Sequence, residues 1–217
     1  MKDSVIITSG GMDSTTMLYE YKDDIALAIT FDYGSTQNGR ERQCAVTHCQ
    51  RLGIRHIIVR LDFMQRYFKS ALLESPEAIP DGNYNDENMK STVVPFRNGI
   101  MLAIACGIAE SNGLHRVMIA NHAGDHTIYP DCQPAFINSM SEAMQNGTYE
   151  KIEVFAPYTH ISKIDIARRG AALGLDYSET YSCYKGGEYH CGTCGTCRER
   201  RMALKTAGII DKTKYLH

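Results

Sequence analysis

Apolar residues along this chain fall into two patterns that alternate with each other. Five short apolar runs, several of them rich in β-branched residues, have the length and composition of buried strands. They lie at residues 5–7, 25–31, 56–59, 116–120 and 152–156. Between them, apolar residues three or four positions apart predict helices at residues 15–21, 40–52, 98–108 and 134–147, and from 162 onward.

This alternation predicts an α/β domain built on a parallel sheet. Parallel strands joined through helices form right-handed crossovers, which place helices on both faces. The expected fold is therefore a Rossmann-like parallel five-stranded sheet with helices on both faces. In such sheets ligands bind beyond the carboxyl ends of the strands. We expect this domain to span residues 1–180, followed by a small C-terminal subdomain at 181–217.

One segment interrupts the alternation. Residues 62–92 contain Pro76, Pro80 and Gly82 and a polar run at 83–90, with little periodicity. Long loops of this kind in a compact domain are usually lids or disordered segments. We interpret the segment as a mobile flap over a bound substrate, with a plain surface insertion as the alternative.

The first strand leads into a glycine-rich turn and a helix. The turn consists of Ser9, Gly10, Gly11, Met12, Asp13, Ser14 and Thr15. Its two glycines permit positive φ and leave no Cβ to obstruct a ligand, and Asp13 and Ser14 are suitable N-cap residues. A helix N-terminus with free backbone N–H groups attracts anions. The turn therefore predicts a phosphate-binding loop.

The residue types in the loop indicate which kind of phosphate site it is. A Walker loop requires a lysine after its glycines, and this loop has none. Gly34 and Gly39 have the Walker spacing, but Arg40 and Glu41 follow where Lys and Ser or Thr are needed. The string Ser-Gly-Gly-x-Asp-Ser-Thr instead resembles the PP-loop of the ATP pyrophosphatase superfamily. Members of that superfamily cleave ATP between the α and β phosphates and leave AMP on an acceptor oxygen.

Two cations near predicted helix starts are candidate ligand contacts. Arg97 directly precedes the most apolar helix, so we expect it to contact an anion or the substrate; an ion pair that locks the loop is the alternative. Ser162 and Asp165 resemble a capping box, which puts Lys163 in the first helical turn. A cation is unfavourable there because of the helix dipole. We therefore expect Lys163 to contact a polyphosphate rather than solvent alone.

Four of the eight cysteines cluster near the C-terminus. They are Cys183, Cys191, Cys194 and Cys197, and glycines between them permit sharp turns. Four thiolates at this spacing can wrap a tetrahedral Zn²⁺, and a site closed by four protein ligands is structural. An iron–sulfur cluster and a redox-active Cys-x2-Cys pair are the alternatives. We expect one structural zinc ion per chain.

Composition argues against several classes of function. The 217 residues, 43% of them hydrophobic and 22% charged, are typical of a globular protein. A formal charge of −2 supplies no basic field for nucleic acid or anionic membranes. The longest apolar-rich stretch, residues 99–109, is shorter than the ~20 residues of a membrane span, and no signal peptide is visible. We therefore expect a cytoplasmic protein with no nucleic-acid or membrane partner.

Six motifs occur in order along the chain. They are the PP-loop, Phe-Asp-Tyr-Gly at 31–34, Val-Pro-Phe-Arg-Asn at 94–98, Tyr-Pro-Asp-Cys at 129–132, His-Ile-Ser-Lys at 160–163 and the cysteine segment 182–197. Together they resemble the 7-cyano-7-deazaguanine synthase family of queuosine biosynthesis, over about residues 5–208. The resemblance implies a Rossmann-like fold of the adenine nucleotide alpha hydrolase type with a zinc-binding tail. Met12, Tyr181 and residues 35–39 depart from the family pattern.

The resemblance also implies a reaction and roles for residues. ATP would convert 7-carboxy-7-deazaguanine and ammonia to the 7-cyano product through an adenylated acid and an adenylated amide, with Mg²⁺ accompanying ATP. By analogy with the superfamily, Asp13 would orient the loop and the metal, and Lys163 would stabilise charge on the phosphates. Arg97 would pair with the substrate carboxylate, and Asp131 and Tyr33 would contact the deazaguanine.

Two other classes of function remain as alternatives. One is a PP-loop enzyme that thiolates transfer RNA or forms lysidine, although the chain shows no basic face. The other is a zinc-ribbon interaction module with a nucleotide-sensing domain. Because no glutaminase domain is visible, we expect free ammonia or a partner to supply the nitrogen. A homodimer is the expectation from the family.

Overall fold

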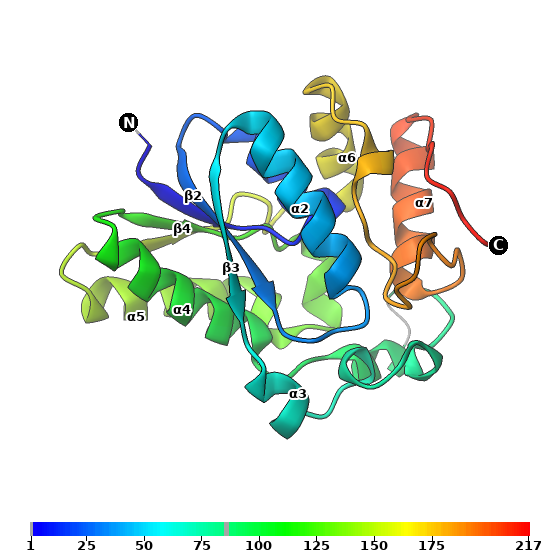
Figure 1. The fold of residues 1–217 in the computed structure, drawn as a ribbon, viewed down its shortest axis with the longest axis horizontal. Coiled ribbons are helices and arrows are strands. Elements are labelled where there is room, and N and C mark those ends of the chain that lie inside the picture. Colours follow the sequence, from blue (N-terminus) through cyan, green and yellow to red (C-terminus); the bar gives the residue numbers. More distant parts are fainter. Residues whose placement is uncertain (1, 85–86) are drawn as a thin grey trace.

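The central feature of the fold is a single parallel sheet (Figure 1). The computed structural model describes residues 2–84 and 87–217. The strands are β1 (Ser4–Ile7), β2 (Ile25–Asp32), β3 (Arg55–Arg60), β4 (Arg116–Met118) and β5 (Glu153–Phe155), in the order β3-β2-β1-β4-β5. The predicted five-stranded sheet is confirmed. Its strand order reverses direction between β1 and β4, and ligands bind beside such a switch point.

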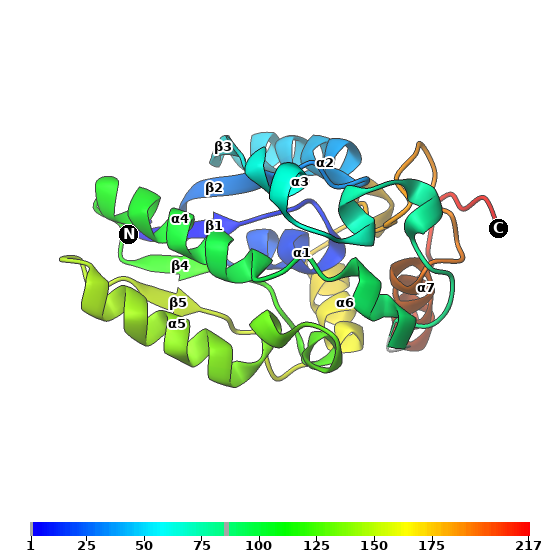
Figure 2. The same ribbon diagram turned by 90° about the horizontal axis from the view of Figure 1, so that it is seen from below.

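Helices cover both faces of the sheet (Figure 2). On one face lie α4 (Arg97–Ser111) and α5 (Pro134–Gly147), and on the other lie α1 (Met12–Glu20) and α2 (Asn38–Leu52). This arrangement confirms the Rossmann-like architecture. Gly53 ends α2 in the left-handed conformation with φ 63°, as its place after the apolar periodicity predicts.

Successive residues of β1 belong to different hydrophobic cores. Val5 packs in the core that contains Leu102 of α4, whereas Ile6 packs with Met17 of α1 and Cys49 of α2. Side chains of a strand point alternately to its two faces. A parallel strand covered by helices on both faces must therefore be apolar at every position, which explains the uninterrupted apolar run.

Helix α1 begins earlier than the sequence predicts. Its first residue is Met12 and its N-cap is Gly11, so the predicted caps Asp13 and Ser14 lie inside the first turn. The Ser14 hydroxyl instead accepts a hydrogen bond from the backbone N–H of Ser9 at 3.2 Å. The carboxylate of Asp13 also does not cap the helix, and it faces Lys163 instead.

Helix α4 also begins at a different residue. Its first residue is Arg97, after Phe96 with a left-handed φ of 54°. Asn98, where the sequence pattern starts this helix and whose side chain could cap it, therefore lies within the first turn and is not the cap. The Asp131 carboxylate serves as the cap acceptor instead, because it accepts the Asn98 backbone N–H at 2.8 Å.

The described residues of the segment 62–92 include short helices that lie beyond the carboxyl ends of the strands (Figures 1 and 2). They are α3 (Phe63–Tyr67), η1 (Ala71–Leu73), η2 (Pro76–Ala78) and η3 (Glu87–Thr92). Met64, Leu72 and Met89 are fully buried, so the segment is anchored by apolar contacts. Its mobility as a flap stays a prediction, and residues 85–86 of the predicted flap lie outside the described residues.

The C-terminal segment packs directly on the α/β domain. Leu204 of α7 (Gly195–Ala207) shares a core with Met12 of α1 and Ala167 of α6 (Lys163–Ala172). Arg200, which is fully buried, donates to the Thr180 hydroxyl at 2.9 Å. The remaining short helices are η4 (Ala123–Thr127), η5 (Pro130–Cys132) and η6 (Tyr177–Glu179).

One helical stretch meets the length and composition of a membrane span. It is Glu87–Ser111, and 50% of its most apolar window is buried inside the fold. The stretch combines η3 with α4, and Leu102 and Ala105 of α4 are fully buried. The fold therefore accounts for its apolar composition as that of a core helix.

Candidate active site

The PP-loop joins β1 to α1 at the carboxyl edge of the sheet. Gly10 has a φ of 89°, and a Cβ on it would lie 2.2 Å from the backbone oxygen of Glu41 and 2.7 Å from the backbone nitrogen of Ala45. Both of those atoms belong to α2. Glycine is therefore required at this position by the backbone conformation and by the close approach of α2.

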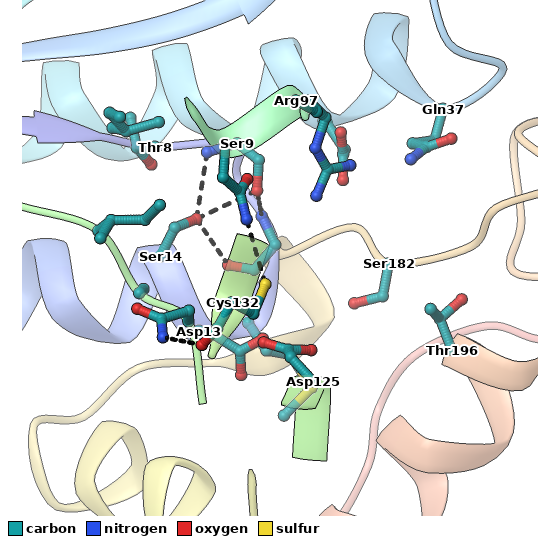
Figure 3. Close-up of a pocket in the computed structure, with 18 of the residues that line it drawn as sticks. Thr8, Ser9, Asp13, Ser14, Gln37, Arg97, Asp125, Cys132, Ser182 and Thr196 are labelled. Carbon is teal, nitrogen blue, oxygen red and sulfur yellow. Dashed lines mark hydrogen bonds between the residues drawn. The ribbon is translucent and has the colours of Figure 1, made fainter. Parts of the chain in front are cut away.

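The hydroxyls of Ser9 and Ser14 form hydrogen bonds within the loop (Figure 3). The Oγ atoms of Ser9 and Ser14 lie 3.2 Å apart, and the Ser9 hydroxyl accepts the backbone N–H of Gly11 at 3.1 Å. The loop thus closes on itself around the start of a nine-residue helix. The N-terminus of such a helix favours a phosphate.

A cavity of about 210 Å³ lies beside the loop. Among the predicted site residues, those that line it are Ser9, Gly11, Met12, Asp13, Ser14, Tyr33, Arg97 and Lys163. Gly10, Thr15 and Asp131 do not line it. The fold therefore brings the phosphate loop, both predicted cations and Tyr33 to one cavity.

Arg97 and Tyr33 form one end of this cavity. The guanidinium donates to the Tyr33 hydroxyl at 3.2 Å and lies 5.7 Å from the centre of its ring. No carboxylate of residues 2–84 or 87–217 lies within 4.0 Å of the Arg97 guanidinium. Its charge is thus available to an anionic ligand in the cavity.

Glu41 of α2 lines the same end of the cavity and was missed by the sequence analysis. Burial raises the pKa of its carboxyl from 4.5 to about 8, although the nearby positive charge of Arg97 partly opposes this effect. A carboxyl group with such a pKa is mostly protonated at pH 7 and half ionised near pH 8, so it can exchange a proton close to physiological pH. Its place in a helix turn beside the PP-loop depends on the packing of α2 against Gly10, which no local sequence signal reveals.

Asp131 lies behind this end of the cavity. Its Oδ2 accepts the backbone N–H of Asn98, and the Asn98 amide donates to the Asp131 carbonyl oxygen at 3.4 Å and to the Cys132 sulfur at 3.1 Å. These bonds anchor the start of α4, which carries Arg97. A contact between Asp131 and the substrate stays a prediction, while Glu41 offers its carboxyl group to the cavity directly.

Lys163 lies between two carboxylates at the opposite side of the PP-loop. Its Nζ is 3.2 Å from Oδ2 of Asp13 and 2.8 Å from Oε2 of Glu199. Burial disfavours the charged lysine, but Asp13 and Glu199 outweigh it and raise the Lys163 pKa well above 10.5. Burial likewise opposes ionisation of Asp13, yet Lys163 and His122 lower the pKa of that carboxyl below 3.8. The pair is therefore ionised at neutral pH.

Further polar groups complete this side of the cavity. His122 Nε2 lies 3.9 Å from Asp13 Oδ2 and 3.5 Å from Asp125 Oδ1, and the Tyr84 hydroxyl donates to Asp125 at 2.9 Å. The Oδ1 atom of Asp13 is buried and has no hydrogen-bond partner among the described residues. Unpaired carboxylate oxygen beside a phosphate site suits Mg²⁺, which is usually held by one or two carboxylates and substrate phosphates.

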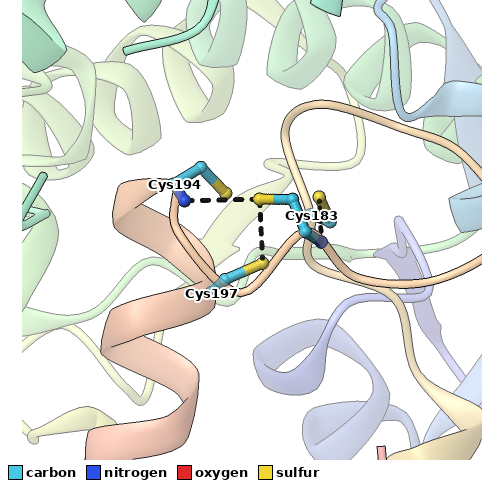
Figure 4. A group of neighbouring side chains, drawn as sticks. Cys183, Cys194 and Cys197 are labelled. Atoms are coloured by element: carbon cyan, nitrogen blue, oxygen red, sulfur yellow. Dashed lines mark hydrogen bonds between the residues drawn. The ribbon is translucent and has the colours of Figure 1, made fainter. Parts of the chain in front are cut away.

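The four clustered cysteines converge on one point (Figure 4). Their sulfur atoms all lie within 4.8 Å of one another, and Sγ of Cys191 is 3.9 Å from Sγ of Cys197. Sulfurs at the corners of a tetrahedron around zinc, with Zn–S bonds of ~2.3 Å, are about 3.8 Å apart. Backbone N–H groups of Cys191 and Cys194 donate to sulfurs at 3.3 Å, which favours thiolates. The donor set therefore fits zinc.

His190 adjoins the cluster but does not belong to it. Its Nε2 accepts the backbone N–H of Ser182 at 3.1 Å, so that nitrogen is occupied. Ser182, which precedes Cys183, and Thr196, between Cys194 and Cys197, line the cavity beside the PP-loop. The cysteine segment is thus also a wall of this cavity.

Comparison with known proteins identifies the family. The family model described as "Queuosine biosynthesis protein QueC" matches residues 3–208. The chain belongs to this family.

Curated relatives support membership in the QueC family over the whole chain. A 7-cyano-7-deazaguanine synthase from Porphyromonas gingivalis strain W83 is 61% identical over 214 residues, which cover 99% of this chain and 97% of the relative. One from Desulfotalea psychrophila is 50% identical over 100% of both chains. One from Methanoregula boonei is 44% identical over 98% of each.

A solved structure supports the fold. The NMN synthetase from Francisella tularensis superimposes with a TM-score of 0.51, over 96% of this chain and 78% of that protein. At 13% sequence identity the similarity concerns the fold alone.

Proposed function

We propose that this protein is a 7-cyano-7-deazaguanine synthase, an ATP-dependent ligase that makes a nitrile from 7-carboxy-7-deazaguanine and ammonia in queuosine biosynthesis. The observation that carries the proposal is that one cavity holds both the PP-loop and Arg97, whose guanidinium has no carboxylate within 4.0 Å among the described residues. A phosphate site next to a site for a carboxylate is what adenylation of an acid requires. Relatives of that name, up to 61% identical, support the same reaction.

The reaction proceeds through two adenylations. The substrate carboxylate attacks the α-phosphorus of ATP, and pyrophosphate leaves. Ammonia then adds to the activated carbonyl carbon, and AMP departs with loss of one proton to leave the amide. The amide oxygen attacks a second ATP, and loss of pyrophosphate, AMP and two protons leaves the nitrile. Two ATP molecules thus yield two AMP and two pyrophosphate per nitrile.

The PP-loop side of the cavity would bind ATP. Backbone N–H groups at the start of α1 would hold its phosphates, and the Lys163 ammonium would offset charge that develops on them in the transition state. Mg²⁺, held by Asp13, would supply electrostatic stabilisation of the phosphate oxygens when bound. The buried, unpartnered Oδ1 of Asp13 supports this assignment.

The Arg97 side of the cavity would bind the acid. The guanidinium would pair with the carboxylate and so orient it toward the α-phosphate, and the Tyr33 hydroxyl would keep Arg97 in place. Glu41 would accept protons, first from ammonium and then from the nitrogen of the amide as it becomes the nitrile. The raised pKa of its carboxyl supports that role.

Three further properties belong to the proposal. Ammonia, free or delivered by a partner, would supply the nitrogen. The protein would act in the cytoplasm, and as a homodimer. Sedimentation equilibrium of the purified protein tests the last of these.

A turnover assay tests the proposed function. Purified protein is incubated with 7-carboxy-7-deazaguanine, ATP, Mg²⁺ and ammonium, and mass spectrometry follows the acid, amide and nitrile while AMP and ADP are quantified. Nitrile with two AMP per product supports the proposal. Nitrile with ADP would contradict the adenylation route, and an unconsumed acid would contradict the substrate.

A further inference from the structure

Helix α7 places the carboxylate of Glu199 against Lys163, which lines the cavity beside the PP-loop. Glu199 Oε2 accepts a hydrogen bond from Lys163 Nζ at 2.8 Å, and the two side chains are only 11% and 12% exposed. Asp13 Oδ2 lies 3.2 Å from the same Lys163 Nζ, which is farther than Glu199 Oε2. Glu199 is therefore the nearer of two anions that compete for one cation.

The number of hydrogen-bond donors on Lys163 limits how many groups its ammonium can bind at once. A lysine ammonium has three donors, and Asp13 and Glu199 occupy two of them, so one remains for a phosphate. Asp13 Oδ1, in contrast, is buried and unpartnered among the residues described. With Glu199 present, Lys163 does not need Asp13 as its sole counter-ion. Without that second anion, the ammonium would move toward Asp13 and compete with a metal ion there.

The position of Glu199 depends on the cysteine cluster. It follows Cys197 by two residues in α7, and Cys194 is the N-cap of that helix. Two of the four sulfur ligands therefore fix the start of the helix that carries Glu199. A zinc ion bound by the four cysteines would hold the carboxylate against Lys163.

We propose that Glu199 is a positioning residue that draws the Lys163 ammonium away from Asp13, so that Asp13 stays available to the metal ion that accompanies ATP. The zinc-bound start of α7 holds Glu199 in place for this role. The inference rests on the proposed ATP chemistry, but not on the identity of the acid that is activated.

The test is metal binding by Glu199→Gln. Mn²⁺ is titrated into protein saturated with α,β-methylene-ATP, which cannot be cleaved between the α and β phosphates, and free Mn²⁺ is followed by electron paramagnetic resonance. We expect the Kd for Mn²⁺ to rise about tenfold in Glu199→Gln, with Glu199→Asp restoring most of the affinity. Arg198→Gln, an exposed neighbour on the same helix, should bind Mn²⁺ like the wild type.

Two results would overturn the inference. One is an unchanged Mn²⁺ affinity in Glu199→Gln. The other is a parallel loss of Mn²⁺ affinity, nucleotide affinity and thermal stability, which would indicate a merely structural residue. Wild-type protein that binds Mn²⁺ and the nucleotide but makes no nitrile would contradict the proposed substrate instead, so the two failures are distinguishable.

Chelation of zinc tests the link to the cysteine cluster. We expect zinc removal to weaken Mn²⁺ binding in the wild type, and to add little in Glu199→Gln, because the same contact is already lost. Circular dichroism monitors whether the rest of the fold persists. If zinc removal weakens Mn²⁺ binding by the same factor in Glu199→Gln as in the wild type, zinc does not act through Glu199, and this link is contradicted.

Discussion

Gly10 lies so close to helix α2 that a Cβ on it would sit 2.2 Å from the backbone oxygen of Glu41. This contact joins the phosphate loop to the helix that carries the proposed proton acceptor. The phosphate loop and the part of α2 that carries Glu41 are therefore in direct contact, and neither can shift without moving the other.

Gly10→Ala should uncouple these elements. The positive φ alone costs of order 1–3 kcal/mol for a residue with a side chain, and the clash with α2 adds to it. We expect nucleotide binding to be lost and the melting temperature to fall by several degrees. Gly39→Ala is the matched control, because a Cβ there meets no atom within 4 Å. Calorimetric titration with ATP and thermal unfolding measure both effects; normal nucleotide affinity in Gly10→Ala would contradict this reading.

Glu41→Gln should alter the pH dependence of turnover. As a proton acceptor Glu41 must be ionised, and its carboxyl has a pKa of about 8. The wild-type kcat/KM should therefore rise with pH up to about 8. In Glu41→Gln this rise should disappear and kcat should fall by roughly 10²–10⁴. Glu142→Gln, exposed on α5, is the control. A raised KM with unchanged kcat would instead assign Glu41 to substrate binding.

The same variant should be more stable than the wild type in mild alkali. Between pH 4.5 and about 8 the folded state keeps a proton on Glu41 that the unfolded state has lost. Wild-type stability therefore declines as pH rises through this window. Gln does not titrate, so the stability of Glu41→Gln should not show this decline. Its free energy of unfolding minus that of the wild type should therefore be larger at pH 8 than at pH 5, by up to a few kcal/mol, since one pKa unit corresponds to about 1.4 kcal/mol. Urea unfolding at the two pH values measures it; an equal difference at both would contradict the raised pKa.

Arg97→Ala should weaken binding of the acid. A hydrogen bond to a charged group contributes about 1.5–3 kcal/mol, so KM for 7-carboxy-7-deazaguanine should rise roughly ten- to hundredfold. KM for ATP should change little, because the PP-loop is untouched. Tyr33→Phe, which removes only the hydroxyl that accepts from Arg97, should give a smaller increase. Steady-state kinetics with each substrate varied separates the two KM values, and a rise confined to ATP would refute the assignment.

Cys194→Ser should remove zinc. Loss of one ligand opens a closed four-sulfur site, and metal binding contributes to folding energy in such sites. We expect about one zinc ion per chain in the wild type and a large loss in the variant, with a lower melting temperature. Cys44→Ser, outside the cluster and partly exposed, should keep its zinc. Plasma emission spectrometry measures the metal; iron in place of zinc would favour the iron–sulfur alternative.

Local patterns in the sequence were sufficient to predict the fold, the glycine-rich turn between β1 and α1, and the four cysteines that converge near the C-terminus. Strand β1 is buried on both faces, so its run of apolar residues is visible without any knowledge of its partners. The PP-loop and the cysteine cluster are likewise built from residues close together in the chain. The chemistry predicted for them follows from residue type and spacing alone.

Tertiary packing decided which side chains line the cavity. Asp131 and Glu41 are both acidic residues beside predicted helix starts, yet Asp131 anchors the start of α4 while Glu41 faces the cavity. Glu199 is one charge among several in a polar helix until α7 packs on α6 and brings it to 2.8 Å from Lys163. Burial, pKa and ion pairing depend on distances between elements that are far apart in the chain. The sequence by itself therefore determined the parts, and only the packing of those parts determined the site.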